Sequence, residues 1–317
     1  MKWATPSQLR RQGILGMNSR NIDYIGRAND RRLYPLVDNK LKTKKAAIQL
    51  GMSAPKLIGV VEIQHEVQLL EELLHGSKKF VIKPAQGSGG KGILVIIDRQ
   101  GDNFIKTTGA TLSFQDVRRH TSNILSGLYS LGGRPDVAMI EDMIDFDPIL
   151  SNYSYEGVPD IRVIIYHGYP VMAMMRCSTH ASDGKANLHQ GAVGVGIDIA
   201  NGHSLYAVQN NNKIETHPDT GCHFHELKLP RWNEVLRLAS ACYEMTTLGY
   251  FGADIVLDKK NGPVILELNA RPGLTIQIAN QAGLQKRLKQ IDRMKTIKQP
   301  INDRIRLAQQ LFGTQQT

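Results

Sequence analysis

Cysteine is scarce in this sequence, with three residues among 317, and no stretch is apolar for long enough to suggest a membrane helix. The three cysteines, Cys177, Cys222 and Cys242, are odd in number and scattered, which excludes a disulfide framework and favours a reducing compartment. A membrane helix needs roughly 18 consecutive apolar residues, whereas the longest apolar runs here have the length of strands. The first residues contain no apolar signal core. We therefore expect a cytoplasmic protein without a transmembrane segment.

Negative charge is in the minority, because 39 Lys and Arg residues against 29 Asp and Glu residues give a net charge of +10. An excess of positive charge favours anionic partners such as nucleotides or acidic peptides. The basic residues are spread along the chain, and aromatic residues make up only 6% of it. Because neither an aromatic platform nor a zinc-finger pattern accompanies the charge, we expect no nucleic-acid partner.

The order of the expected elements indicates the fold class. Strand-length apolar runs outnumber the helices that could connect parallel strands, so the sequence predicts an α+β fold whose lobes are built on antiparallel sheets. Helices are predicted at residues 40–50, 66–74, 116–131, 232–247 and 284–296, and strands at residues 55–61, 80–83, 93–98, 137–144, 161–167, 170–176 and 264–269. Residues 9–39 are basic and weakly periodic, and they are predicted to form an irregular arm.

A cluster of glycines lies between two predicted strands, in the segment Gly87-Ser88-Gly89-Gly90-Lys91-Gly92. Its spacing matches the dinucleotide-binding pattern, but that pattern runs from a strand into a helix, and here a second strand follows. Glycines let backbone N–H groups approach an anion without obstruction by side chains. Lys83 would add a point charge for phosphate oxygens. The segment therefore favours a phosphate-binding hairpin, and a flexible hairpin with a surface lysine is the alternative.

Three oxygen-bearing side chains lie on two predicted strands near the C-terminal end, namely Asp254, Glu267 and Asn269. Glu267 and Asn269 are two residues apart and so project from the same face of a sheet. A two-residue turn at Lys260-Asn261 pairs Asp254 with Glu267, and a turn shifted by one residue pairs it with Asn269. Both registers gather the three side chains, and oxygen ligands of this kind suit Mg²⁺ or Mn²⁺. The alternative is a pair of structural, hydrogen-bonded carboxylates.

A second group of metal-ligand residue types occurs at His217, Cys222, His223 and His225. Their spacing fits no recognised zinc pattern. We therefore expect a loop cluster without a metal.

Together these segments resemble the ATP-grasp superfamily and, within it, the RimK-like α-L-glutamate ligases. The resemblance runs from about residue 40 to residue 284. It rests on Lys40 opening a helix, Lys83 before the glycine loop, Ile140-Glu141-Asp142-Met143-Ile144, Asp160-Ile161-Arg162, Asn187-Leu188-His189, Gly252-Ala253-Asp254-Ile255 and Glu267-Leu268-Asn269-Ala270-Arg271-Pro272-Gly273. Residues 13–44 resemble a subgroup called α-L-glutamate ligase-related proteins. The region 197–232 is similar to sugar-transfer-associated ATP-grasp proteins.

The resemblance implies an ATP-grasp fold, in which two lobes with antiparallel sheets clamp ATP. It divides the chain into an N-terminal arm at residues 1–39, a small lobe with the glycine flap at 40–143, a large lobe with the metal site at 144–300 and a tail at 301–317. RimK-type ligases carry a full domain before the first lysine, whereas 39 residues precede Lys40 here, so a truncated N-terminal region is expected. Two residues also depart from the pattern. Lys185 stands where close relatives have arginine, and Arg271 stands where RimK itself has a small residue.

The same resemblance implies roles for the site residues. Arg162, Arg176 and Arg271 would stabilise charge on the transferring phosphoryl group. For Arg162 a structural ion pair is the alternative. Asp254, Glu267 and Asn269 would hold Mg²⁺ or Mn²⁺. ATP would be bound by Lys40, Lys83, Gly87, Ser88, Gly89, Gly90, Glu141, Asp142, Met143, Asp160, Lys185 and Asn187, with residues 140–144 contacting adenine through backbone groups.

The activity implied by the resemblance is ATP-dependent amide formation through an acyl phosphate. A substrate carboxylate attacks the γ-phosphate of ATP, and an amine, such as an amino acid or acidic peptide, then displaces phosphate. A small-molecule kinase is the alternative enzyme, because ATP-grasp lobes also support transfer to hydroxyl groups. A nucleotide-gated binding protein without turnover is a third reading. The sequence predicts neither the acceptor nor the oligomeric state.

Overall fold

The computed structural model describes residues 4–87, 89–294 and 299–314, and the chain divides into two compact units. The larger unit comprises Met1–Asp38, Ala46–Ser53 and Phe146–Thr317, and the smaller unit comprises Asn39–Lys45 and Ala54–Asp145. Helix α5 (Lys40–Gln49) contributes its first turns to the smaller unit and its end to the larger one. No helix within the described ranges is long and apolar enough to cross a membrane.

The smaller unit is built on a six-stranded antiparallel sheet with the strand order β1-β6-β2-β3-β4-β5. The strands are β1 (Leu57–Val61), β2 (Phe80–Pro84), β3 (Leu94–Gln100), β4 (Asn103–Lys106), β5 (Thr111–Ser113) and β6 (Ala138–Asp142). The helices are η3 (Gln64–Leu69), α6 (Leu70–Leu73), α7 (Phe114–Leu125) and η4 (Leu131–Gly133). Phe80, Ile82 and Ile140 belong to an apolar core that also includes residues of α7. Because side chains alternate along a strand, Met139 points to the other sheet face, where it packs with Leu41 of α5.

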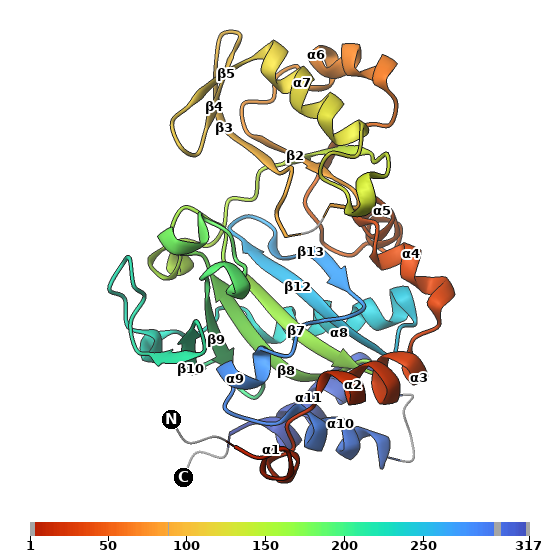
Figure 1. The fold of residues 1–317 in the computed structure, drawn as a ribbon, viewed down its shortest axis with the longest axis vertical. Coiled ribbons are helices and arrows are strands. Elements are labelled where there is room, and N and C mark those ends of the chain that lie inside the picture. The colour runs from red at the N-terminus through yellow and green to blue at the C-terminus, as the bar shows by residue number, and fades with distance from the viewer. Residues whose placement is uncertain (1–3, 88, 295–298, 315–317) are drawn as a thin grey trace. The chain divides into compact units, whose positions relative to one another are not determined.

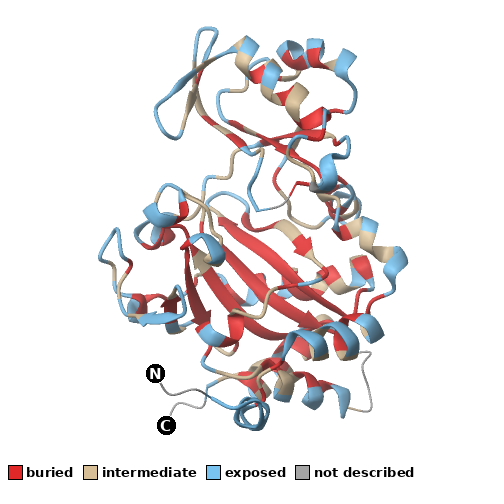
Figure 2. Cartoon of the chain, in the orientation of Figure 1, coloured by how far each residue is buried: buried red, intermediate tan, exposed pale blue. Residues whose placement is uncertain are grey.

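The larger unit is built on a seven-stranded antiparallel sheet with the strand order β11-β10-β9-β8-β7-β12-β13 (Figure 1). The strands are β7 (Asp160–Tyr166), β8 (Tyr169–Cys177), β9 (Val193–Ile197), β10 (Ser204–Gln209), β11 (Asn212–Ile214), β12 (Tyr250–Asp258) and β13 (Gly262–Asn269). Strand β7 is buried along its whole length, and β8 and β12 nearly so (Figure 2). These central strands therefore read as almost continuous apolar runs in the sequence.

Helices cover both faces of this sheet. Helix α8 (Trp232–Thr246) packs behind β7, β8, β12 and β13 in the view of Figure 1, and α9 (Ile276–Ala279) lies in front against β8 and β9. The remaining helices are η5 (Pro148–Tyr153), η6 (His180–Ser182), η7 (Leu188–Gln190), η8 (Phe224–Glu226), α10 (Leu284–Asp292) and α11 (Ile301–Phe312). Residues 301–312, which belong to the expected tail, thus form a helix that packs on β8 and α8.

The prediction of an irregular N-terminal arm is wrong. The arm consists of short helices, α1 (Pro6–Gln12), α2 (Met17–Ser19), η1 (Arg20–Ile25), α3 (Gly26–Ala28), η2 (Arg31–Leu33) and α4 (Tyr34–Val37). These helices were not predicted because their sequences are weakly periodic. Buried hydrogen bonds to the sheet and to α9 hold the arm in place. The buried Asn29 side chain donates to the carbonyl of Tyr250 (2.6 Å) and accepts from its N–H (2.8 Å). Buried Gln277 binds the backbone N–H and carbonyl of Leu15 in the same way (2.8 and 3.1 Å).

Most other predicted elements are confirmed, including the strands on both sides of the glycine loop and the hairpin of β7 and β8. Three helices differ from the prediction. The helix expected at residues 284–296 ends at Asp292, and residues 295 and 296 lie outside the described residues. The helix expected at residues 66–74 begins as the 3-10 helix η3, and the one expected at residues 116–131 ends at Leu125. The α+β class with antiparallel sheets is confirmed.

Candidate active site

The glycine loop joins the antiparallel neighbours β2 and β3, so it is a hairpin rather than the strand-to-helix turn of a dinucleotide-binding fold. Gly89, Gly90 and Gly92 have φ angles of 64°, 75° and 75°, in the left-handed region that favours glycine. A Cβ at position 89 would meet no atom within 4 Å, so the space beside this glycine is open. Ser88, another predicted loop residue, lies outside the described residues.

Two side chains anchor the base of the glycine loop. The buried carboxylate of Asp136 accepts the N–H of Gln86 (3.0 Å) and the hydroxyl of Ser130 (2.6 Å). Lys40, the first residue of α5, donates from its Nζ to the carbonyl of Gly87 (2.7 Å). The structure thus brings Lys40 to the loop from a helix more than 40 residues away in the sequence. Asp136 was not predicted, because no sequence pattern distinguishes it.

Lys83 lies near the end of β2, and its ammonium group is 2.7 Å from Oε2 of Glu141 on the neighbouring strand β6. The other oxygen, Oε1, lies 3.0 Å from Nζ of Lys44 on α5. Lys44 also donates to the carbonyl of Pro55. All three charged side chains are buried. We call this group the lysine–glutamate cluster; the sequence did not single out Lys44, which lies in a run of basic residues at positions 42–45.

The pKa values in this cluster follow from burial and charge. Burial alone would raise the pKa of Glu141, but the charges of Lys83 and Lys44 outweigh it and hold the pKa below its ordinary value. Burial lowers the pKa of Lys44, against the opposing effect of Glu141. Glu141 is therefore the anion that holds two cations in a poorly solvated place.

Asp142 and Met143 follow Glu141 at the end of β6. Asp142 is exposed, and its N–H donates to the carbonyl of Lys56 (2.9 Å). Met143 is half-buried and lies just beyond the strand. The N–H of Asp142 is thus already engaged within the protein.

In the larger unit, Asp254 on β12 pairs directly with Glu267 on β13, and Asn269 lies opposite Gly252. The first of the two open registers is therefore the observed one, but the predicted turn is wrong. Asp258 pairs with Gly262, so three residues form the turn, and a bulge after Asp254 restores the pairing with Glu267. The three oxygen-bearing side chains share one sheet face.

Arg162 and Arg176 lie on the same face, on β7 and β8. Arg162 makes a bidentate contact with Asp254 (2.7 and 2.6 Å), and Arg176 makes one with Asp160 (2.5 and 2.7 Å). Arg176 also donates to Oδ2 of Asp254 (2.6 Å). We call these four residues the arginine–aspartate network. Arg162 thus forms the structural ion pair that was the alternative to a role at the phosphoryl group. Asp160, which was predicted to bind ATP, has its carboxylate bound to Arg176.

Burial and charge separate the two aspartates of this network. Burial would raise the pKa of Asp254, which is fully buried, but Arg162 and Arg176 outweigh that effect and lower the pKa to about 2. Burial raises the pKa of Asp160 to about 6, against the charge of Arg176, and the nearby Asp254 adds to the rise. At neutral pH both carboxyls are ionised, but the pKa of Asp254 is the one that lies far below neutrality.

The donor set on β12 and β13 fits a divalent cation. An ionised carboxylate offers about four acceptor positions, and the arginines take three of those on Asp254, which leaves one on Oδ1. Oδ1 of Asn269 accepts the N–H of Arg271 (2.8 Å). In the described part of the chain no three His, Cys, Asp or Glu side chains form a metal-binding group.

The third predicted arginine, Arg271, lies apart from the arginine–aspartate network. Its guanidinium lies 4.7 Å from the ring centre of Tyr34 and 3.4 Å from the carboxylate of Asp38, both in α4 or directly after it. Half of its side chain is exposed. The N-terminal arm therefore sets the direction of Arg271.

The two remaining predicted ATP ligands lie in the loops after β8. Lys185 is paired with exposed Asp183 (3.0 Å). The Asn187 side chain caps the short helix η7 by accepting the N–H of His189 (3.0 Å). In the group of His217, Cys222, His223 and His225, buried His217 has both ring nitrogens near backbone groups. Its Nε2 lies 3.0 Å from the carbonyl of Ser178, and its Nδ1 accepts N–H groups at 3.2 and 3.3 Å.

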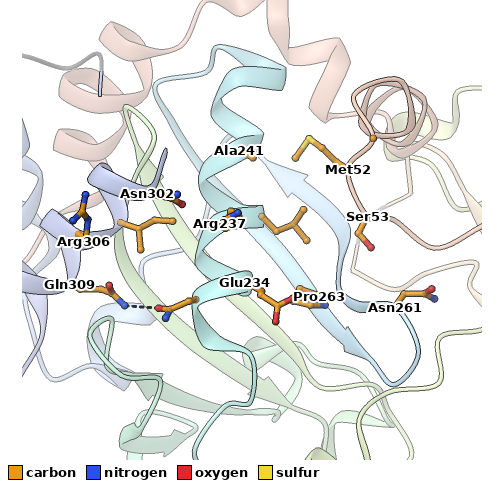
Figure 3. A pocket seen from close by; sticks show the side chains of 14 residues that line it. Met52, Ser53, Glu234, Arg237, Ala241, Asn261, Pro263, Asn302, Arg306 and Gln309 are labelled. Atoms are coloured by element: carbon orange, nitrogen blue, oxygen red, sulfur yellow. Dashed lines mark hydrogen bonds between the residues drawn. The ribbon is translucent and has the colours of Figure 1, made fainter. Parts of the chain in front are cut away.

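A pocket of about 580 Å³ lies elsewhere in the larger unit, and no predicted site residue lines it. Helix α8 runs through its middle, with residues of α11 on one side and Met52, Ser53 and Pro263 on the other (Figure 3). Arg237 and Arg306 lie at its exposed surface. This hollow is separate from the residues that carry the predicted chemistry.

With this geometry in view, comparison with known proteins decides the family. The family described as sugar-transfer associated ATP-grasp matches residues 19–293, which is most of the chain. The chain belongs to the sugar-transfer associated ATP-grasp family. It has the α+β ATP-grasp-like fold with two antiparallel sheets, and the superfamily expected from the motifs is confirmed. No curated protein matches the sequence.

Solved structures of ATP-grasp ligases are similar to this family member at low identity. The ATP-grasp ligase PsnB complexed with minimal precursor has a TM-score of 0.45 and 13% identity, over 83% of this chain and 62% of that one. The VanG D-Ala:D-Ser ligase from Enterococcus faecalis has a TM-score of 0.48 and 12% identity, over 82% and 62%. D-alanine–D-alanine ligase from Bacillus anthracis has a TM-score of 0.44 and 15% identity, over 95% and 76%. The chain thus spans less than two thirds of the PsnB and VanG chains.

Proposed function

We propose that the chain is an ATP-dependent, ADP-forming carboxylate–amine ligase of the RimK-like type, which joins glutamate or another amino acid to a small or peptide acceptor. The observation that supports it most is the pairing of Asp254 with Glu267 beside two guanidinium groups, in a chain of the ATP-grasp family. Oxygen donors next to fixed cations match the charge that develops when a phosphoryl group is transferred.

The smaller unit would bind the phosphates and the base of ATP. Lys83 and Lys40 would offer ammonium groups to phosphate oxygens, and N–H groups of the glycine loop would bind them without side-chain obstruction. The residues after Glu141, among them Met143, would contact adenine through their backbone. The support is that Lys40 and the glycine loop already meet at Gly87.

The larger unit would handle the reacting end of the nucleotide. Asp254, Glu267 and Asn269 would hold Mg²⁺ or Mn²⁺, which when bound neutralises charge on the β- and γ-phosphates. Arg162 and Arg176 are held rigidly by their carboxylate partners and would stabilise negative charge on the transferring group. Lys185, Asn187, Asp160 and Arg271 remain proposed contacts of the nucleotide or the acyl phosphate.

The proposed reaction has two steps. A carboxylate oxygen of the first substrate forms a bond to the γ-phosphorus while the bond between that phosphorus and the β,γ-bridging oxygen breaks, which gives an acyl phosphate and ADP. The amine nitrogen of the second substrate then bonds to the acyl carbon while the bond between that carbon and the phosphate oxygen breaks. Inorganic phosphate leaves, and the nitrogen loses a proton to water. Exclusion of water by the glycine loop would protect the acyl phosphate from hydrolysis.

An ADP-release screen tests this proposal. The protein is incubated with ATP, Mg²⁺ and pairs drawn from amino acids, short acidic peptides and simple carboxylates, and products are read by mass spectrometry. A ligase gives the mass of acid plus amine less water. A product that has gained a phosphoryl group would establish the kinase alternative, and no ATP consumption across the panel would favour a binding protein without turnover.

The role of Lys83 can be tested without knowing the acceptor. Lys83→Ala should weaken binding of ATP, because it removes a cation next to the glycine loop, and isothermal titration would measure the loss. The exposed Lys79→Ala, on the approach to the same strand, is the matched control. Equal affinities in the variant and the wild type would count against a phosphate-binding role for Lys83.

A further inference from the structure

The lysine–glutamate cluster contains one more cation than anion. Lys44 and Lys83 are 5% exposed and Glu141 is 3% exposed, so water screens none of these charges well. The pKa of Glu141 is shifted by the charges of these two lysines. The pKa of Lys44 is shifted by the charges of Glu141 and Lys83. The cluster as a whole therefore keeps one positive charge in a buried place, which is unfavourable unless an anion compensates it.

The two lysines divide the carboxylate between them. Oε1 of Glu141 faces Lys44 and Oε2 faces Lys83, at 3.0 and 2.7 Å. If Lys44 were absent, the same carboxylate would neutralise Lys83 completely. Lys44 also donates a hydrogen bond to the carbonyl of Pro55, two residues before β1. This second contact fixes the position of its ammonium group independently of Glu141.

We propose that Lys44 is a positioning residue that sets the charge of the nucleotide site: by taking one oxygen of Glu141, it leaves Lys83 with a net positive charge for a polyphosphate anion. This inference rests on the proposed function, because it assigns Lys83 to phosphate oxygens. Lys44 itself does not touch the ligand. Its contribution passes through Glu141 to Lys83.

The surroundings favour an anion with several oxygens rather than a single carboxylate. Lys40 reaches the glycine loop in the same unit, at the carbonyl of Gly87. Lys83 is only four residues before Gly87, so cationic and N–H donors follow one another along this stretch of backbone. A chain of phosphate groups offers an oxygen to each of these donors.

The test is the binding of the non-hydrolysable analogue AMPPNP, with Mg²⁺, measured by isothermal titration calorimetry. Lys44→Met keeps the length of the side chain and removes its charge, and we expect affinity to fall about 10- to 100-fold. Lys44→Arg should stay within about threefold of the wild type. The matched control is Lys42→Met, which removes one exposed charge from the same helix and should change affinity by less than about threefold.

A double variant separates charge setting from a merely structural role. Lys44→Met with Glu141→Gln leaves Lys83 charged beside a neutral amide, so affinity should recover most of what Lys44→Met loses. If Lys44 only packs the unit together, the second substitution adds damage and gives no recovery. Circular dichroism melting of each variant shows whether it is folded at the titration temperature.

The outcomes distinguish this inference from the function on which it rests. A wild-type protein that does not bind AMPPNP would overturn the proposed function and this inference with it. A wild type that binds, together with a folded Lys44→Met variant of equal affinity, would overturn only the inference. Folded single and double variants that are equally weak would overturn it too.

Discussion

The two units of this protein each bury a cluster of charged side chains, and the clusters differ in their balance. In the larger unit, two arginines and two aspartates form the arginine–aspartate network, whose charges cancel and whose guanidinium groups are bound at several nitrogens. In the smaller unit, two lysines share one glutamate, and a positive charge is left over. The charges of the first cluster are balanced, whereas the second cluster has one more cation than anion.

The residue types suit this difference. A guanidinium is planar and binds a carboxylate at two points, so it fixes direction as well as charge. A lysine ammonium is a point charge that can turn its hydrogens from a carboxylate to a phosphate oxygen. The bidentate contacts therefore fix the side chains of the arginine–aspartate network, and Glu267, which pairs with Asp254 across the two strands, also acts electrostatically on Arg176.

The largest effect is expected at Glu267, which lies outside the balanced network. Glu267→Ala should lower Mg²⁺-dependent ADP formation by at least about 1000-fold, because it removes a carboxylate ligand of the metal that offsets phosphate charge. Turnover is measured as ADP release, and the fold is checked by circular dichroism. The exposed Glu226→Ala is the control. Unchanged turnover would remove the metal-site assignment.

Asp254 should matter for stability as well as for the metal. Asp254→Ala leaves two buried guanidinium groups without a partner they share, and breaking such a buried pair costs about 3–5 kcal/mol. The free energy of unfolding, from urea titration of the metal-free protein, measures the loss. Asp303→Ala breaks an exposed pair with Arg306 and should cost less than about 1 kcal/mol. Similar losses for the two variants would contradict the view that the network stabilises the larger unit.

The network also predicts how stability depends on pH. The pKa of Asp254 is lowered to about 2 from an ordinary value of 3.8, so the stabilisation is fully present above pH 4 and is lost as the pH falls toward 2. The loss amounts to about 2 kcal/mol. Urea unfolding of the metal-free protein between pH 5 and pH 2 measures it, and Asp254→Asn should flatten this dependence.

Asp160 supplies the opposite sign within the same network. Its pKa is raised to about 6, so its contribution favours folding at low pH and is lost as the pH rises through 6. In Asp160→Asn, the free energy of unfolding should therefore still fall between pH 4 and pH 2, where Asp254 titrates. Its change between pH 4 and pH 6, where Asp160 titrates, should be smaller than in the wild type. Equal flattening of both limbs by either variant would show that the two aspartates titrate as one group.

The sequence predicted those features of the site that depend on short apolar runs and on alternation along a strand. The strands around the glycine loop and the shared face of Glu267 and Asn269 are of this kind. The pairing of Asp254 with Glu267 was one of two open registers. A three-residue turn alone would pair Asp254 with Leu266, and a bulge after Asp254 shifts the pairing by one residue to Glu267. The alternation of apolar and polar residues does not show where a bulge lies.

Other features depend on tertiary contacts that a single sequence does not display. Lys44 stands beside exposed Lys42 and Lys45, and only the position of α5 on the sheet decides which lysine meets Glu141. The arm has weak periodicity, yet it is folded, because single amide side chains join it to the sheet at Tyr250 and to α9 at Gln277.

That arm gives the smallest of the expected effects and extends the comparison of the units. Where β13 has ended, the side chain of Asn29 takes the place of a further strand on β12 by bonding both backbone groups of Tyr250, and the carbonyl of Ala28 accepts the N–H of Gly249 (3.0 Å). Asn29→Ala should lower the free energy of unfolding by about 1–2 kcal/mol, since two hydrogen bonds to buried groups are lost. Urea unfolding measures the change, with the exposed Asn18→Ala as the control. Because the smaller unit contains only Asn39 of the arm, Asn29→Ala should leave AMPPNP binding by Lys83 and the glycine loop nearly unchanged. A variant that keeps its stability but loses nucleotide binding would contradict this division of roles between the units.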